Sequence, residues 1–84
     1  MPWIDTIPPQ RRRQLETALD ADGAEHLRYA AGDPDFAMFL LVADAAAGRR
    51  LGVSIFDLPD ACWRDFYDDG LTPMEAVATA SESE

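Results

Sequence analysis

The chain has little of what catalytic and metal sites are usually built from. Cys62 is the only cysteine and His26 the only histidine among its 84 residues, and lysine and asparagine are absent. A lone cysteine excludes a disulfide within the chain and favours a reducing compartment, so we expect a cytoplasmic protein. Catalysis needs a nucleophile or an acid–base group beside an orienting partner, and these two residues fall in different predicted helices. We therefore expect no enzymatic activity, no cofactor and no bound metal.

Each of these scarce residues has an ordinary structural interpretation. Cys62 falls on the apolar side of a predicted helix beside Phe66, which predicts a buried, inert thiol. His26 belongs to a segment with few apolar residues, so we expect it on the surface. The acids of residues 20–25 resemble the opening of a calcium loop. The third oxygen ligand before the glycine and the distal glutamate are missing, however, which indicates a plain helix end.

Long apolar runs are missing too. The longest spans residues 36–43, far short of the roughly 20 residues that cross a bilayer. Residues 1–5 also lack the basic region and apolar stretch of a secretory signal. The sequence therefore predicts a protein that is neither exported nor embedded in a membrane.

Positive charge is scarce in the carboxy-terminal part. The net charge is -9, and all seven basic residues are arginine. Residues 1–50 hold six arginines and eight acids, whereas residues 51–84 hold one arginine and eight acids, so the two parts sum to -2 and -7. Because such a field repels DNA, RNA and anionic lipid, direct binding to nucleic acid or to a membrane is disfavoured.

What the sequence does contain is a series of helix signals. The chain length predicts a single domain over residues 1–84, and we expect an all-α fold: a small bundle of four to five short helices with a carboxy-terminal helical hairpin. Proline and glycine bound the predicted helices, which cover residues 10–20, 24–31, 34–47, 57 or 58 to 70, and 73–80, with a frayed tail over 81–84. Residues 51–56 carry β-branched side chains but have no partner strand, so we predict a loop or short turn there.

The helix predicted over residues 34–47 has the clearest signals. Asp33 is a good cap, and Pro34 suits the first helical position. The main apolar stripe consists of Phe36, Phe39, Leu40, Ala43 and Ala47, and the apolar residues of the other side are Met38, Leu41, Val42 and Ala45. Only Asp44 and its neighbours are left for water. A helix that is apolar almost all round is buried by its own domain or by a second subunit, so a self-associating module, in the simplest case a homodimer, is one functional alternative.

The last predicted helix begins with a capping box, Thr72-Pro73-Met74-Glu75. Met74, Val77 and Ala78 are expected to pack back onto the preceding helix. The hairpin has the outline of a helix-turn-helix, so a small DNA-binding regulator is a second alternative. Its second helix, however, offers carboxylates and small residues where side chains that read bases are needed.

Acidic residues gather at this end of the chain and form our candidate site. We predict a protein-binding face built from Asp57, Asp60, Asp65, Asp68, Asp69 and Glu75, in which Arg64 bridges Asp60 and Asp68 at a spacing of four residues. Such a face would dock on the basic surface of a protein, for example a nucleic-acid-binding complex. It could imitate DNA charge in the manner of phage anti-CRISPR or anti-restriction proteins. An equally weighted alternative is that the acidity only keeps a small domain soluble. The arginines at 11–13 and 49–50 are predicted to be solvated.

The stretch over residues 57–76, DLPDACWRDFYDDGLTPMEA, resembles the tail of small acidic proteins from high-GC bacteria and their phages and plasmids. That group has no assigned activity. The resemblance implies a two-helix arrangement of this stretch and an origin in a mobile genetic element.

Overall fold

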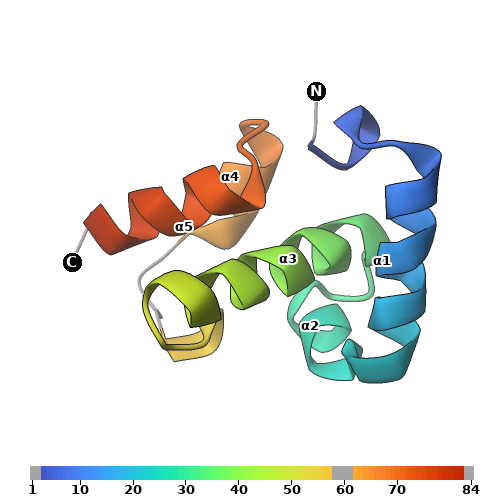
Figure 1. Cartoon of the computed structure of the whole chain (residues 1–84), viewed down its shortest axis with the longest axis horizontal. Coiled ribbons are helices and arrows are strands. Elements are labelled where there is room, and N and C mark those ends of the chain that lie inside the picture. The colour runs from blue at the N-terminus through green and yellow to red at the C-terminus, as the bar shows by residue number, and fades with distance from the viewer. Residues whose placement is uncertain (1–2, 58–61, 83–84) are drawn as a thin grey trace.

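Helix α3 (Pro34–Arg50) forms the axis of the computed structural model, which describes residues 3–57 and 62–82 (Figure 1). Helices α1 (Pro9–Asp22) and α2 (Ala24–Tyr29) lie at the amino-terminal end of α3. Helices α4 (Trp63–Asp68) and α5 (Pro73–Glu82) pack on the side of α3 that faces away from α2. Two short 3-10 helices, η1 (Trp3–Thr6) and η2 (Ile55–Asp57), also contact α3. Within the described ranges the regular elements are all helices and none is a strand, so the predicted all-α bundle is confirmed.

The start of α3 is fixed by local capping, as predicted. The Asp33 carboxylate accepts hydrogen bonds from the backbone N–H groups of Asp35 (3.1 Å) and Phe36 (3.3 Å), and Pro34 occupies the first helical position. Two of the N–H groups that a helix start leaves without a partner inside the helix are thereby satisfied.

The end of α3 lies beyond the prediction. The helix passes through Gly48 and continues to Arg50, three residues past the predicted Ala47. The turn that ends it comes at Gly52, whose φ of 71° is a conformation that glycine adopts readily. The Gly52 N–H donates to the Ala47 carbonyl at 3.1 Å, which satisfies a carbonyl at the helix end. Gly48 is therefore a helical residue, and the stop signal is the next glycine along the chain.

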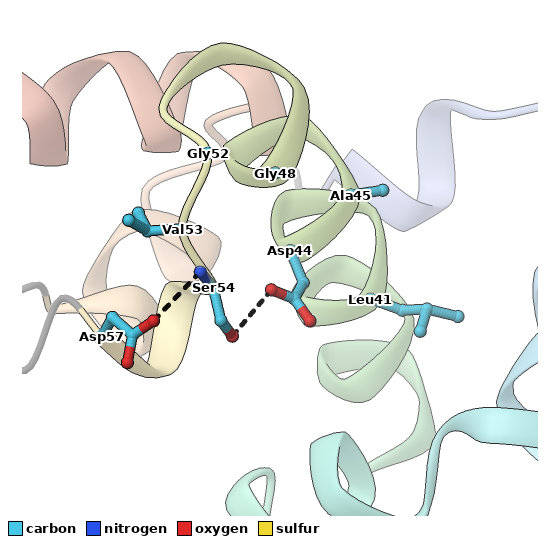
Figure 2. A pocket seen from close by; sticks show the side chains of 8 residues that line it. All are labelled: Leu41, Asp44, Ala45, Gly48, Gly52, Val53, Ser54 and Asp57. Atoms are coloured by element: carbon cyan, nitrogen blue, oxygen red, sulfur yellow. Dashed lines mark hydrogen bonds between the residues drawn. The ribbon is translucent and has the colours of Figure 1, made fainter.

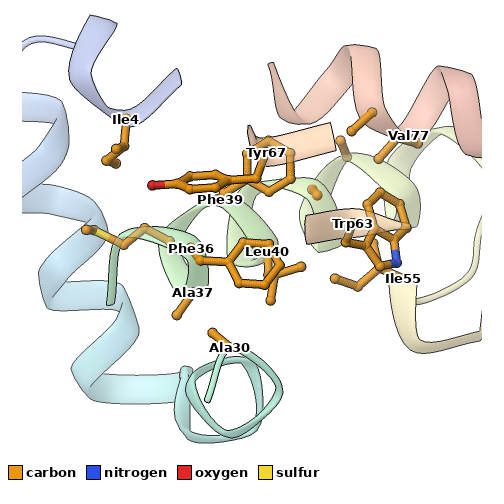
Figure 3. Packing of buried hydrophobic residues seen from close by; sticks show 14 of the residues in the cluster. Ile4, Ala30, Phe36, Ala37, Phe39, Leu40, Ile55, Trp63, Tyr67 and Val77 are labelled. Atoms are coloured by element: carbon orange, nitrogen blue, oxygen red, sulfur yellow. The ribbon is translucent and has the colours of Figure 1, made fainter. Parts of the chain in front are cut away.

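The apolar stripe of α3 is the centre of the hydrophobic core. All five of its predicted members are at most 3% exposed, and so is Met38 on the other side. The surrounding elements add Ile4, Ile55, Trp63, Tyr67 and Val77 to the core (Figure 3). Leu15 and Leu19 of α1 are also part of it. The Tyr67 ring lies against Phe36 and Phe39, with centroids 5.3 and 5.4 Å apart. Because the stripe is covered from within the chain, no second subunit is needed to bury it.

The amino-terminal residues fold onto this core. Ile4 is 2% exposed, and the Trp3 ring meets Phe39 edge to face at 6.1 Å. Helix α1 runs to Asp22, two residues beyond the prediction, and α2 ends at Tyr29, two residues before its predicted end. Neither helix start has a side-chain cap, and boundaries are least sharply defined by the sequence where caps are missing.

The helix predicted from 57 or 58 to 70 is shorter in the structure. Asp57 belongs to η2, where its N–H donates to the Ser54 carbonyl at 3.0 Å, and α4 begins only at Trp63. The prediction is therefore wrong at Asp57, because this residue closes a local turn with Ser54. The predicted first turn with Pro59 lies outside the described residues.

Helix α5 begins with the predicted capping box. The Thr72 N–H donates to the Glu75 carboxylate at 2.9 Å, and the Glu75 N–H donates to the Thr72 hydroxyl at 3.1 Å. The helix continues to Glu82, two residues beyond its predicted end at Ala80. Val77 is buried as expected, but Met74 is 52% exposed, because α5 packs mainly on α3 through Ala76, Val77 and Ala80 rather than on α4. The hairpin thus turns Met74 to the solvent.

Candidate functional site

The predicted acidic face is exposed wherever the structure describes it. It comprises Asp57 at the end of η2, Asp65 and Asp68 in α4, Asp69 directly after α4, and Glu75 in the first turn of α5, and all five side chains are exposed. Asp60 lies outside the described residues. Positions three and four apart share one side of a helix, so the three aspartates of the α4 region project together.

Little positive charge inside the chain neutralises these carboxylates. Arg64 pairs with Asp68 at 3.4 Å, as predicted, and its other partner is Asp33 at 3.2 Å. The same guanidinium lies 4.9 Å from the centre of the Phe36 ring, which holds it against the core. Arg12 pairs with other acids, Asp35 (2.6 Å) and Glu16 (3.4 Å). Of the described members of the acidic face, only Asp68 has an ion pair.

Two members of the face also serve the fold. Glu75 uses one carboxylate oxygen in the capping box, and Asp57 accepts a hydrogen bond from the Ser54 N–H at 3.3 Å. Both bonds go to backbone amides, so each side chain keeps its negative charge. These two acids are therefore held in place, one in η2 and one at the start of α5, without being neutralised there.

A second polar cluster, centred on Asp44, was not expected from the sequence. His26 Nε2 lies 2.9 Å from one oxygen of the Asp44 carboxylate, and the other oxygen accepts from the Ser54 hydroxyl (2.9 Å) and the Ile55 N–H (3.1 Å). His26 is 7% exposed and its ring packs on Phe56, with centroids 5.2 Å apart. The prediction that His26 lies on the surface is wrong, because its ring is buried between α2 and α3, with Nε2 on Asp44 and Nδ1 without a hydrogen-bond partner among the described residues. Asp44 keeps 26% of its side chain exposed, so it reaches water as predicted while it also bonds inward.

The charge of Asp44 is stabilised by this cluster. Burial by itself raises the pKa of the carboxyl group, but hydrogen bonds from the Ile55 N–H, His26 and Ser54 outweigh it, and the pKa lies below its ordinary value of 3.8. His26 and Ser54 both bond to Asp44 and not to each other, so the cluster is not arranged to activate the serine as a nucleophile. Its chemistry is that of a fixed negative charge that joins three elements.

An open depression lies beside Asp44 (Figure 2). It has a volume of about 490 Å³ and is lined by Leu41, Asp44, Ala45 and Gly48 of α3 and by Gly52, Val53, Ser54 and Asp57 of the following segment. Figure 2 shows Ser54 between the two carboxylates, hydrogen-bonded to each. The wall is apolar and the only charged lining groups are acidic, so the depression suits a cation with an apolar stem.

Cys62 does not occupy the predicted position. Its side chain is exposed, because it immediately precedes α4 and the buried place at the start of that helix is taken by Trp63. Over residues 3–57 and 62–82, no three His, Cys, Asp or Glu side chains are grouped so as to hold a metal ion. No helix in these ranges combines the length and the apolar character that a bilayer crossing requires.

Comparison with known proteins leaves the site to be interpreted from its own geometry. No protein-family model matches the chain, and no curated protein or solved structure is significantly similar to it.

Proposed function

We propose that the protein is a non-enzymatic, cytoplasmic interaction module whose acidic face docks on the basic surface of another protein. The observation that carries this proposal is the exposure of Asp65, Asp68, Asp69 and Glu75, of which only Asp68 has an ion pair in the described part of the chain. The remaining described acid of the predicted face, Asp57, is also exposed but belongs to a different element, η2. Carboxylates that the fold leaves uncompensated attract a basic partner and speed its association.

A DNA-binding surface is the partner that fits best. Such a surface is built to receive regularly spaced phosphate charges on a stiff scaffold. The aspartates of the α4 region sit on a short helix that Trp63 and Tyr67 anchor in the core, so their charges are presented on a firm support. The protein would then imitate DNA charge and block a nucleic-acid-binding complex, as anti-restriction and anti-CRISPR proteins of mobile elements do.

The two alternatives have less support. Self-association was suggested by the apolar α3, whose stripe is covered by other parts of the same chain. A DNA-reading α5 would need basic or amide side chains at its surface. The exposed residues of α5 are Met74, Glu75, Thr79 and Glu82, of which two are acidic.

Charge reversal on the acidic face tests the proposal. The tagged protein is used to capture partners from the host lysate, and each captured protein is identified by mass spectrometry and then purified. The double variant Asp65→Arg/Asp69→Arg should lose the binding of a specific partner, and duplex DNA should compete with the wild type for it. Binding should also weaken steeply between about 50 and 200 mM salt.

A matched control distinguishes an effect of this face on binding from an effect of the protein's net charge. Asp20→Arg/Asp22→Arg makes the same change in charge on exposed positions of α1, and it should leave the partner bound. If both double variants bind equally well or equally poorly, or if the partner binds no nucleic acid, the proposal is wrong. Circular dichroism shows in each case that helicity is retained.

A further inference from the structure

The depression beside Asp44 is a built feature that the acidic face alone does not explain. It is formed where the carboxy-terminal half of α3 meets the segment that follows (Figure 2). Asp44 and Asp57 line it from two different elements, and Leu41, Ala45 and Val53 supply the apolar wall. Gly48 and Gly52 leave it open, since a Cβ atom at either glycine would meet nothing within 4 Å.

Two carboxylates give this depression its negative potential. Asp44 is ionised at neutral pH, and its three hydrogen bonds leave about one acceptor position of the carboxylate unused. Asp57 is exposed and accepts one backbone hydrogen bond. The carboxy-terminal end of α3 adds little, because Arg49 and Arg50 lie in its last turn and offset the partial negative charge of the helix end.

The positive groups of the same region are not among the lining residues. Arg50 follows Gly48 by two positions, about 160° from it around the helix, whereas Arg49 follows the lining residue Ala45 by four positions and lies one turn beyond it. His26 contacts Asp44 from the side of α2 and is itself buried, so it leaves the mouth of the depression free.

We propose that this depression receives one arginine side chain of a basic protein, with the guanidinium on the solvent side of Ser54, beside the Asp44 and Asp57 carboxylates, and the alkyl stem on the apolar wall. Arginine fits better than lysine because its planar group has five donors that can serve two carboxylates at once, and because it is more weakly hydrated beside apolar surface. This inference rests on the proposed function in one respect, since it takes the partner to be basic.

The test is a titration of the isotopically labelled protein with the blocked tripeptide acetyl-Gly-Arg-Gly-amide, followed by NMR at low salt. We expect saturable shifts of the amide signals of Gly48, Gly52 and Val53. The same peptide with citrulline, which keeps the shape of arginine without its charge, should cause none. The lysine peptide should bind more weakly than the arginine peptide.

Two variants locate the site. Gly48→Leu fills the depression from a helical position with open space above it, so the fold is kept and the arginine peptide should bind at least about 5-fold more weakly. Asp57→Asn keeps an acceptor for the Ser54 N–H and should weaken binding about 3-fold, the effect of one exposed ion pair. Asp65→Asn, an acid outside the depression, should have no effect.

Unchanged binding in Gly48→Leu, or equal binding of the citrulline or lysine peptide, overturns the inference. Its failure is distinguishable from failure of the proposed function. If the peptide does not bind while Asp65→Arg/Asp69→Arg still loses the captured partner, only the arginine site is wrong. If the peptide binds as expected while those reversals have no effect on the partner, the acidic face is wrong.

Discussion

Removing the Asp44 carboxylate should cost the protein a large part of its stability. Asp44→Ala leaves the His26 ring, which is 7% exposed, and the N–H of Ile55, a residue 1% exposed, without their partner. Each buried polar group that loses its partner costs about 1–3 kcal/mol. Ser54 is only half-buried and can turn its hydroxyl to water. We therefore expect a loss of about 2–6 kcal/mol, with the lower half of this range favoured because the Asp44 side chain is 26% exposed.

This loss is large beside the total stability, which for a chain of 84 residues is about 4–13 kcal/mol. Urea unfolding followed by circular dichroism measures it. With a slope of about 1 kcal/mol per M, the midpoint should fall by about 2 M or more. Asp44→Asn is the matched control, because its amide oxygen still accepts from Ser54 and Ile55 and only the pairing with His26 changes. It should lose about 1 kcal/mol.

Two results would refute the reasoning. One is an Asp44→Ala protein within about 0.5 kcal/mol of the wild type, the range of an ordinary surface substitution. The other is an asparagine variant that loses as much as the alanine variant, since the hydrogen bonds to the 54–55 segment would then contribute nothing.

Three further perturbations follow from the same structure. The lowered pKa of Asp44 means that its ionised form adds stability above pH 3.8 and that this contribution is lost as the pH falls through the lower folded-state pKa. Urea midpoints of the wild type and Asp44→Asn should therefore converge in acid, and a constant difference would contradict this. Burial, followed by the charges of nearby aspartates, raises the pKa of Tyr67 above its ordinary 10.0, so stability is lost as the pH rises through that raised value. In a spectrophotometric titration Tyr67→Phe should lack the later phase of tyrosine ionisation. Gly23→Ala should destabilise the protein by about 1–3 kcal/mol, because a Cβ there would collide with the Leu19 side chain and lie 2.6 Å from the Leu19 carbonyl oxygen. Gly48→Ala should instead stabilise it by up to about 1 kcal/mol, and thermal unfolding of the two variants should show opposite shifts.

The features that the sequence predicted correctly depend on neighbouring residues. The cap of α3 needs only Asp33 and the amides two and three residues later, and the capping box of α5 involves only positions 72 to 75. The buried stripe of α3 follows from helical periodicity alone. Because these interactions join residues at most a few positions apart, the sequence alone predicts where both helices begin.

The Asp44 cluster depends on residues far apart in the chain. His26 and Asp44 are 18 positions apart, and whether they meet is decided by the angle at which α2 packs on α3. The sequence did carry one signal, namely a single carboxylate inside an otherwise apolar helix. Such a group is seldom left buried without partners, and the only histidine was an available one.

Cys62 shows how one error in a helix boundary moves a side chain. A helix that starts near residue 57 turns Cys62 to the apolar side with Phe66, whereas the observed start at Trp63 leaves it before the first turn and exposed. Asp57 is affected in the same way. Its place in η2 brings it to the depression beside Asp44 and separates it from the aspartates of α4.

The acids of this protein divide into those that the fold uses and those that it does not. Asp33 caps α3 and pairs with Arg64, and Asp44 joins three elements, so their removal destabilises the protein. Asp65 and Asp69 make no ion pair in the described part of the chain and repel their acidic neighbours. Reversing their charge should therefore change stability little. A loss of partner binding in that variant would then come from the changed acidic face and not from unfolding.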